Sequence, residues 1–157
     1  MNARGFTLIE SLVALVVLSV GLLGAAATLL GSLGAHAEAM RRATALGLVH
    51  DAAERIRANA AARAAYDTRS AAAGADCTAA SCDAAARAAM DRTHFIDAAR
   101  VAFPFADTRA DIHFEPAAGP AAPDRYEITL RFPPRSQPGA VDGVALTVLS
   151  FAPAAGA

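Results

Sequence analysis

The residue whose chemistry is hardest to place in this sequence is Glu10, a carboxylate inside an apolar run. It is the only charged residue between Arg4 and Glu38. The stretch from Phe6 to Leu33 is otherwise apolar and long enough to cross a bilayer. A charge inside such a span costs about 2.5–3.5 kcal/mol on insertion scales, so such residues are rare unless they have a function. Glu10 therefore predicts a compensating partner.

The two cysteines, Cys77 and Cys82, are the second feature with reactive chemistry. Their spacing allows a disulfide that closes a short loop in an oxidising compartment, which would contribute about 2 kcal/mol through loop-closure entropy. Free thiols and a metal site are the alternatives. Zinc would need two more ligands, and the C-x-x-C spacing of zinc sites is missing. We therefore favour the disulfide.

The histidines and the composition add no further candidate site. His36, His50, His94 and His113 show no spacing with carboxylates that resembles a catalytic triad or a metal site. The net charge of −1 creates no global field for nucleic acid, and all 14 basic residues are arginine. We therefore expect no enzyme activity, no metal, no cofactor and no nucleic-acid partner.

The 157 residues predict one small domain beyond the apolar run. That part holds few large apolar residues over roughly 100 positions, so its core must be small and a disulfide would help to stabilise it. Two simple interpretations of the run are incomplete. A signal peptide would match the A-x-A pattern at residues 35–37, but the run is about twice too long for one. A plain membrane anchor fits the length but leaves Glu10 unexplained.

The motif at residues 5–10 is GFTLIE, which resembles the processing site of type IV prepilins and type II secretion pseudopilins. The resemblance implies that a prepilin peptidase cuts between Gly5 and Phe6, removes residues 1–5 and methylates the new amine of Phe6. In that family the glutamate at the position of Glu10 pairs with the N-terminal amine of a neighbouring subunit, which gives each charge a partner in hydrocarbon. Two interactions within the same subunit are alternatives to this pairing. The carboxylate of Glu10 could interact with the helix dipole, or with the amine of Phe6 in its own chain, four residues before it.

Helical periodicity continues beyond the apolar run. The apolar residues at helical spacing are Leu46, Val49, Ala53 and Ile56. Because no proline occurs before Pro104, we expect one helix from residue 6 to about residue 64, amphipathic in its second half. So long a helix cannot bury itself in one small domain, and its first half must lie in lipid or in a bundle of similar helices.

The rest of the chain predicts a short helix followed by a sheet. Residues 83–101 have helical composition, and residues 126–132 alternate apolar and polar side chains as a half-buried strand does. Shorter strands are expected around residues 112–114 and 144–148, with a bulge or phase change near Leu149. We expect the helix face around Ile56 to cover the apolar face of this sheet. The predicted fold is α+β and pilin-like, with a long N-terminal helix packed on a small antiparallel sheet.

A second motif, AERIRAN at residues 53–59 with Tyr66 beyond it, narrows the resemblance. It is similar to the minor pilins called type IV pilus modification protein PilV, as is GLLG at residues 21–24. That group often has a tryptophan after the position of Cys82, and this chain has none. Taken alone, the motif fits a solvated helix face, since a Glu54–Arg57 pair contributes only a few tenths of a kcal/mol.

The resemblance implies four parts: a leader (1–5), a transmembrane and assembly half-helix (6–33), an amphipathic half-helix (34–65) and a small periplasmic domain (66–157). The implied function is a minor pilin that spans the inner membrane once and takes part in type IV pilus assembly or modification. Its implied partners are prepilin peptidase, other minor pilins, the major pilin and inner-membrane lipid. The alternatives are an I-class minor pseudopilin of type II secretion and a membrane-tethered periplasmic binding or adhesive module.

Overall fold

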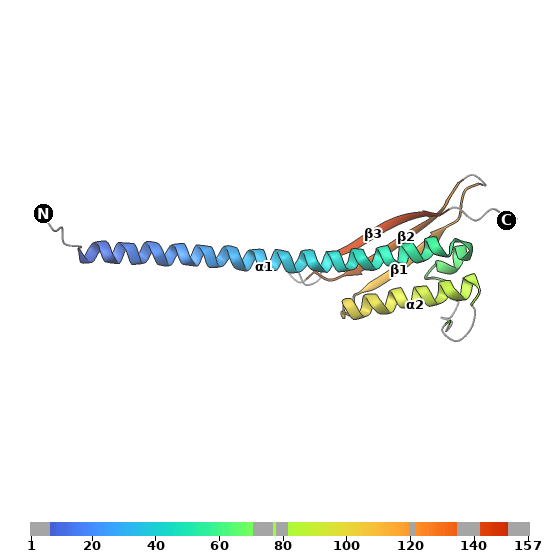
Figure 1. Ribbon diagram of the computed structural model, residues 1–157, viewed down its shortest axis with the longest axis horizontal. Helices are drawn as coiled ribbons and strands as arrows, with labels where there is room; N and C mark the ends of the chain where they lie inside the picture. The colour runs from blue at the N-terminus through green and yellow to red at the C-terminus, as the bar shows by residue number, and fades with distance from the viewer. Residues whose placement is uncertain (1–6, 71–76, 78–81, 120–121, 135–141, 151–157) are drawn as a thin grey trace. The chain divides into compact units, whose positions relative to one another are not determined.

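The computed structural model describes residues 7–70, 77, 82–119, 122–134 and 142–150. The elements in chain order are α1 (Leu8–Ala58), the 3-10 helix η1 (Ala60–Tyr66), α2 (Ala84–Ala102), β1 (Arg109–Glu115), β2 (Asp124–Phe132) and β3 (Asp142–Ser150) (Figure 1). The chain divides into two compact units, Met1–Met40 and Arg41–Ala157. The fold is α+β, as predicted, with a long apolar N-terminal helix and a three-stranded antiparallel sheet.

The described part of the first unit is the apolar portion of α1. Its most apolar stretch has a mean hydropathy of 2.5, is entirely unburied and is long enough to cross a membrane. The hydroxyls of Ser19, Thr28 and Ser32 donate to backbone carbonyls three or four residues earlier, at 2.8–2.9 Å. These bonds satisfy polar groups that would otherwise be unpaired in hydrocarbon. The helix surface is thus suited to lipid or to other apolar helices.

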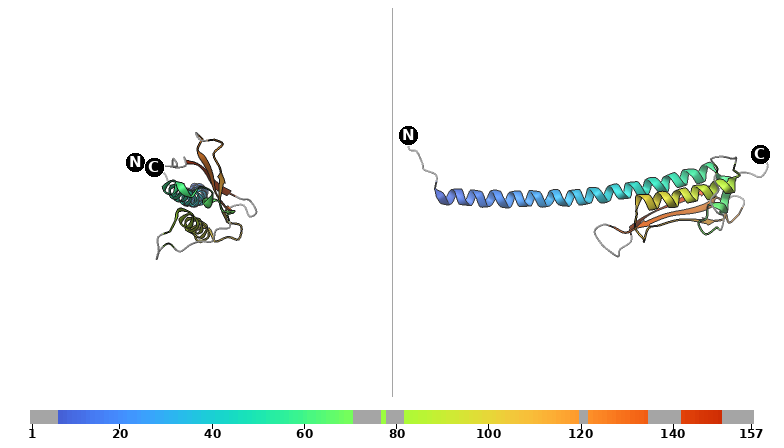
Figure 2. Two further views of the ribbon diagram at one scale, coloured as in Figure 1. Left: turned by 90° about the vertical axis from the view of Figure 1, so that its right-hand side faces the viewer. Right: turned by 90° about the horizontal axis from the view of Figure 1, so that it is seen from below.

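The second unit is built on the sheet, whose strand order is β1-β2-β3. Along β2 every second side chain is buried, and these are Asp124 and the apolar residues Tyr126, Ile128, Leu130 and Phe132. The later part of α1 and α2 cover this face of the sheet, as Figure 2 shows in the view along the helices. The pairing of β2 with β3 runs without a break from Asp124–Ser150 to Phe132–Asp142. The expected bulge is therefore wrong up to Ser150, and Phe151 lies outside the described residues.

The face of α1 that packs in the second unit includes Ala45 and Ala52, which were not in the predicted stripe, and leaves out Leu46. Val49, Ala53 and Ile56 are fully buried as expected, but Leu46 is 43% exposed and Ala45 takes its place. Residue 45 lies four positions before Val49 on the same helix face, and residue 46 is turned about 100° from residue 45, which places it at the edge of that face. Small alanines on this face allow α1 to lie close to its neighbours.

Arg41 joins α1 to the aromatic end of this core. Its guanidinium lies 5.3–5.7 Å from the ring centres of Phe103, Phe105 and Phe132, and its Nη2 donates to the carbonyl of Pro133 at 2.9 Å. Phe103 and Phe132 stack on each other with ring centres 4.3 Å apart. The arginine therefore stabilises a cluster contributed by α1, β2 and the end of α2.

The α-helix ends at Ala58, so the prediction that it continues to about residue 64 is wrong. Asn59 has non-helical backbone angles, and its side-chain amide donates to the carbonyl of Ala84 at 2.9 Å and to the hydroxyl of Tyr66 at 3.3 Å. These bonds turn the chain into η1 without a proline. Helix α2 confirms the expected helix at 83–101, and its first turn is capped by Asp83, whose Oδ1 accepts from the amide of Ala86 at 2.7 Å.

Candidate functional site

The predicted processing and assembly residues lie at the start of the chain. Gly5 and Phe6 lie outside the described residues. Glu10 is exposed in the first turn of α1, where its backbone amide donates to the carbonyl of Thr7 at 3.1 Å. A carboxylate at this end of a helix interacts favourably with the helix dipole. Its exposed side chain is accessible to a charged group from outside the unit.

A buried polar network lies in the second unit, and sequence reasoning did not anticipate it. Arg55 donates from Nη1 to Oδ1 of Asp91 at 3.0 Å and from Nε to Oδ2 of Asp51 at 2.8 Å. The hydroxyl of Tyr66 lies 2.8 Å from Oδ2 of Asp91 and 3.0 Å from the carbonyl of Arg55. With Asn59 bound to the same hydroxyl, the network connects α1, η1 and α2.

Burial favours the neutral hydroxyl of Tyr66 in this network. Tyr66 is 1% exposed and the side chain of Asp91 is 7% exposed. Burial, reinforced by the carboxylate of Asp91, raises the pKa of Tyr66 above its usual range, so the hydroxyl keeps its proton and donates it. The guanidinium of Arg55 balances the charge of Asp91. Every partner is thus satisfied, which is the condition for a buried polar group to be stabilising.

The network explains half of the AERIRAN motif. Ala53 and Ile56 enter the core, while Arg55 and Asn59 hold η1 and α2. Glu54 and Arg57 only pair with each other on the exposed surface of α1. The structure therefore separates the motif into a packing part and a solvated part, and the solvated part agrees with the simpler interpretation of the sequence.

A second ion pair holds the turn within η1. Oδ1 and Oδ2 of the buried Asp124 accept from Nη2 and Nε of Arg63, both at 2.8 Å, and Oδ1 also accepts from the amide of Ala117 at 2.9 Å. The guanidinium of Arg63 lowers the pKa of Asp124 below its usual range. Arg63 has a φ of 44°, an uncommon conformation for a residue with a side chain. The bidentate pair and the ring of Phe114, 6.0 Å away, keep it in place.

A third cluster anchors the segment after η1 to the sheet. Asp67 accepts from the side chain of Arg69 at 2.7 and 2.9 Å and from the amide of Phe114 at 3.0 Å. The nearby guanidinium of Arg69 holds the pKa of Asp67 well below its usual range. Arg92 donates to the carbonyl of Asp67 at 2.5 Å. These bonds fix Thr68 beside β1.

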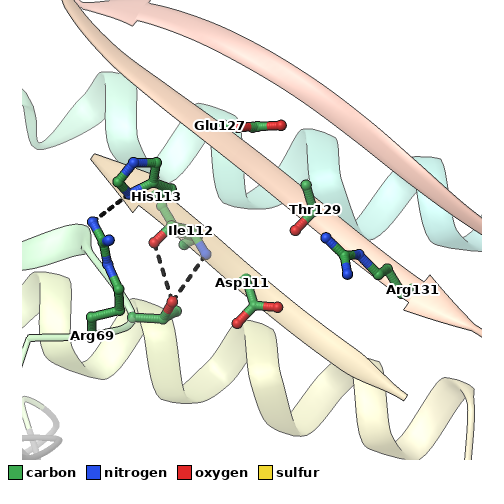
Figure 3. Close-up of a pocket in the computed structure, with 8 residues that line it drawn as sticks. Arg69, Asp111, Ile112, His113, Glu127, Thr129 and Arg131 are labelled. Carbon is green, nitrogen blue, oxygen red and sulfur yellow. Dashed lines mark hydrogen bonds between the residues drawn. The ribbon is translucent and has the colours of Figure 1, made fainter. Parts of the chain in front are cut away.

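An open polar cavity of about 240 Å³ lies next to this cluster on the outer face of the sheet. Figure 3 shows Arg69 pointing toward His113 on β1, with Asp111 on the same strand and Glu127 and Arg131 on β2. Because the cavity is lined by side chains of both charges, it favours neither an anionic nor a cationic ligand. Among the described residues, no group of three histidine, cysteine or carboxylate side chains could hold a metal ion.

Cys77 and Cys82 form a disulfide, with Cα atoms 5.6 Å apart. This confirms the pairing that we favoured over free thiols and metal. Cys82 directly precedes Asp83, the residue that caps α2. The disulfide therefore closes a loop at the start of the helix that carries Asp91.

In comparisons with known proteins, two family models match the part of the chain that contains most of the described helices. A family model described as the prokaryotic N-terminal methylation motif matches residues 1–26, and one described as type IV pilin Tt1218 matches residues 27–93. The second match includes Arg55, Tyr66 and Asp91. No curated protein and no solved structure matches. The two adjacent matches support a place for this chain in the type IV pilin family.

Proposed function

We propose that this protein is a minor pilin that takes part in type IV pilus assembly or modification. Prepilin peptidase cuts between Gly5 and Phe6, the amine of Phe6 is methylated, and the mature subunit assembles through α1. The observation that carries the proposal is the exposed apolar surface of α1 with the single carboxylate Glu10 in its first turn. A pilin is a structural subunit, so we expect no enzyme activity.

Glu10 has a specific role in this proposal. Cleavage creates a cationic amine on Phe6, which is as poorly placed in hydrocarbon as the carboxylate of Glu10. Pairing the amine of one subunit with Glu10 of its neighbour removes the penalty of burying either charge alone. The exposure of Glu10 supports this role, since its side chain is accessible to another subunit.

The minor-pilin assignment rests on the second unit. The polar network around Tyr66 uses the AERIRAN residues that resemble PilV, and the small core is stabilised by a disulfide. A disulfide is typical of oxidising compartments, which supports a periplasmic second unit and a single inner-membrane span before assembly. Other minor pilins and the major pilin are the proposed partners, together with inner-membrane lipid.

The proposal is tested by replacing Glu10→Ala and measuring the amount of the protein in pili sheared from cells. We expect normal cleavage in the membrane fraction and a large loss from the sheared pili. Glu54→Ala is the matched control, because Glu54 is an exposed carboxylate on the same helix that pairs only with Arg57 among the described residues. Assembly of Glu10→Ala at the wild-type level would show that the charge-pairing account is wrong.

A further inference from the structure

We infer that the groove between α2 and the outer edge of β1 binds an extended, acidic segment of a partner protein, which adds to the edge of β1 as a short strand. The site lies wholly within the second unit. It goes beyond the proposed pilin role, in which the subunit assembles through α1, and peptide binding tests it independently of N-terminal processing.

The edge of β1 is only partly covered. Thr68 donates its amide to the carbonyl of Ile112 at 2.9 Å, and the amide of Ile112 donates to Oγ1 of Thr68 at 3.3 Å, so both groups of Ile112 point away from β2. In an antiparallel pair these directions alternate along the strand, and the amide and carbonyl of Ala110 therefore point outward as well. Apart from the bonds within helices and strands, no described residue makes a backbone hydrogen bond to the amide or the carbonyl of Ala110.

A groove of about 560 Å³ lies along this open edge and includes Ala110 in its lining. Ile96 of α2 contributes apolar surface to it, and Phe105 stands at 46% exposure in the loop that follows α2. An exposed strand edge is a template for pairing with another extended chain. The groove thus offers main-chain partners on one side and apolar contact on the other, the arrangement used in strand addition.

The charges around the groove favour a negatively charged occupant. Three arginines line it, Arg69, Arg100 and Arg109, against one carboxylate, Asp111. Arg109 donates from Nη1 to the carbonyls of Ala106 and Thr108 at 2.7 and 3.0 Å and has no carboxylate partner among the described residues.

The other two arginines differ in how far they are already neutralised. Arg100 pairs with Asp97 at 3.6 Å with both side chains largely exposed, and such pairs contribute little. Arg69 is held by Asp67 at 2.7 Å. Arg109 and Arg100 are therefore the side chains available to bind carboxylates of an incoming strand. A basic segment would meet the same charges unfavourably, and a helix would leave the main-chain groups of Ala110 unpaired.

The inference is tested with the full chain in detergent micelles and short blocked peptides in which valine alternates with glutamate, glutamine or lysine. Nuclear magnetic resonance titration gives the affinities, and hydrogen exchange at the Ala110 amide reports pairing. We expect saturable binding of the glutamate peptide with slower exchange at Ala110, weaker binding of the glutamine peptide and none of the lysine peptide. Arg109→Gln should weaken binding of the glutamate peptide about tenfold, and Arg87→Gln, an exposed arginine of α2 outside the groove, should not.

Ala110→Pro removes the outward amide without removing a bond between β1 and β2, so it should abolish peptide binding in a folded protein. Absence of binding by the glutamate peptide would overturn the inference. Equal affinity for the glutamate and glutamine peptides would also overturn it, as would unchanged exchange at Ala110 in the wild-type complex. The exchange measurement uses the wild-type chain and decides the question even if the proline variant does not fold.

Discussion

The hydroxyl of Tyr66 lies 2.8 Å from Oδ2 of Asp91, and the other oxygen of the same carboxylate accepts from Arg55 at 3.0 Å. The carboxylate is almost completely buried, so these two bonds replace most of its hydration. Three elements, α1, η1 and α2, thus meet at one charge. We expect this relationship to stabilise the second unit, because a buried charge that loses a partner is strongly destabilising.

Tyr66→Phe should lower the free energy of unfolding by about 1–3 kcal/mol, because it leaves Asp91 with one partner fewer. Chemical denaturation of the full chain in detergent micelles measures this. The control is Tyr126→Phe. Tyr126 is also fully buried, but its hydroxyl has no hydrogen-bond partner in the described structure, and burial raises its pKa to about 12. Its loss should be neutral or stabilising, and equal destabilisation by both variants would contradict the account.

The sequence predicted the sheet but not this network. The alternation of residues 126–132 predicted β2 correctly, because one face of the sheet is buried and the other is exposed. The network itself joins residues 36 positions apart, Arg55 and Asp91, and no local pattern marks such a pair. Aspartate is a residue type that is usually exposed on a helix, so the sequence did not mark Asp91 as buried.

Two incorrect predictions, the end of α1 and the burial of Leu46, also arise from contacts between residues far apart in the sequence. Asn59 ends α1 through a bond to Ala84, 25 residues away, and the predicted end relied on breakers within the helix itself. Leu46 fits the periodic stripe as well as Ala45 does, and only the close packing in the second unit selects the smaller residue. The predictions at Gly5, Phe6 and Glu10 concern processing and assembly, and they stay predictions.

Acid should destabilise the second unit through Asp124 and Asp67, whose pKa values are lowered in the folded chain. The stability that they contribute is complete above the unfolded value of about 3.9 and is lost as the pH falls through the lower folded values. Asp124→Asn should be less stable than wild type at neutral pH, and the difference should narrow below about pH 4. Parallel stability curves for the two proteins down to low pH would contradict this assignment.

Two glycines should respond oppositely to alanine. A Cβ at Gly143 would lie 2.9 Å from the backbone carbonyl oxygen of Leu130, which cannot move without disturbing the sheet. Gly143→Ala should therefore destabilise by about 1–3 kcal/mol. A Cβ at Gly47 meets nothing within 4 Å on the exposed face of α1, so Gly47→Ala should stabilise by up to about 1 kcal/mol through helix propensity. Thermal unfolding of both variants measures these two changes in stability. A change in the same direction for both variants would be inconsistent with the packing.

The disulfide should contribute about 2 kcal/mol, because it closes a short loop in the unfolded chain. Replacing both Cys77→Ser and Cys82→Ser should lower the free energy of unfolding by that amount. Reductant should have the same effect on the wild-type chain and none on the double variant. Unchanged stability on reduction would show that the bond adds nothing to the second unit.

In the proposed function, cleavage at Gly5-Phe6 creates the charge that Glu10 requires. Mass spectrometry of the mature N-terminus, on protein purified from its native membrane or pili, measures whether this cleavage occurs. The account predicts a chain that starts at Phe6 and carries a methyl group on its amine. An intact Met1, or a chain that starts at Glu38 after signal-peptide cleavage, would contradict it.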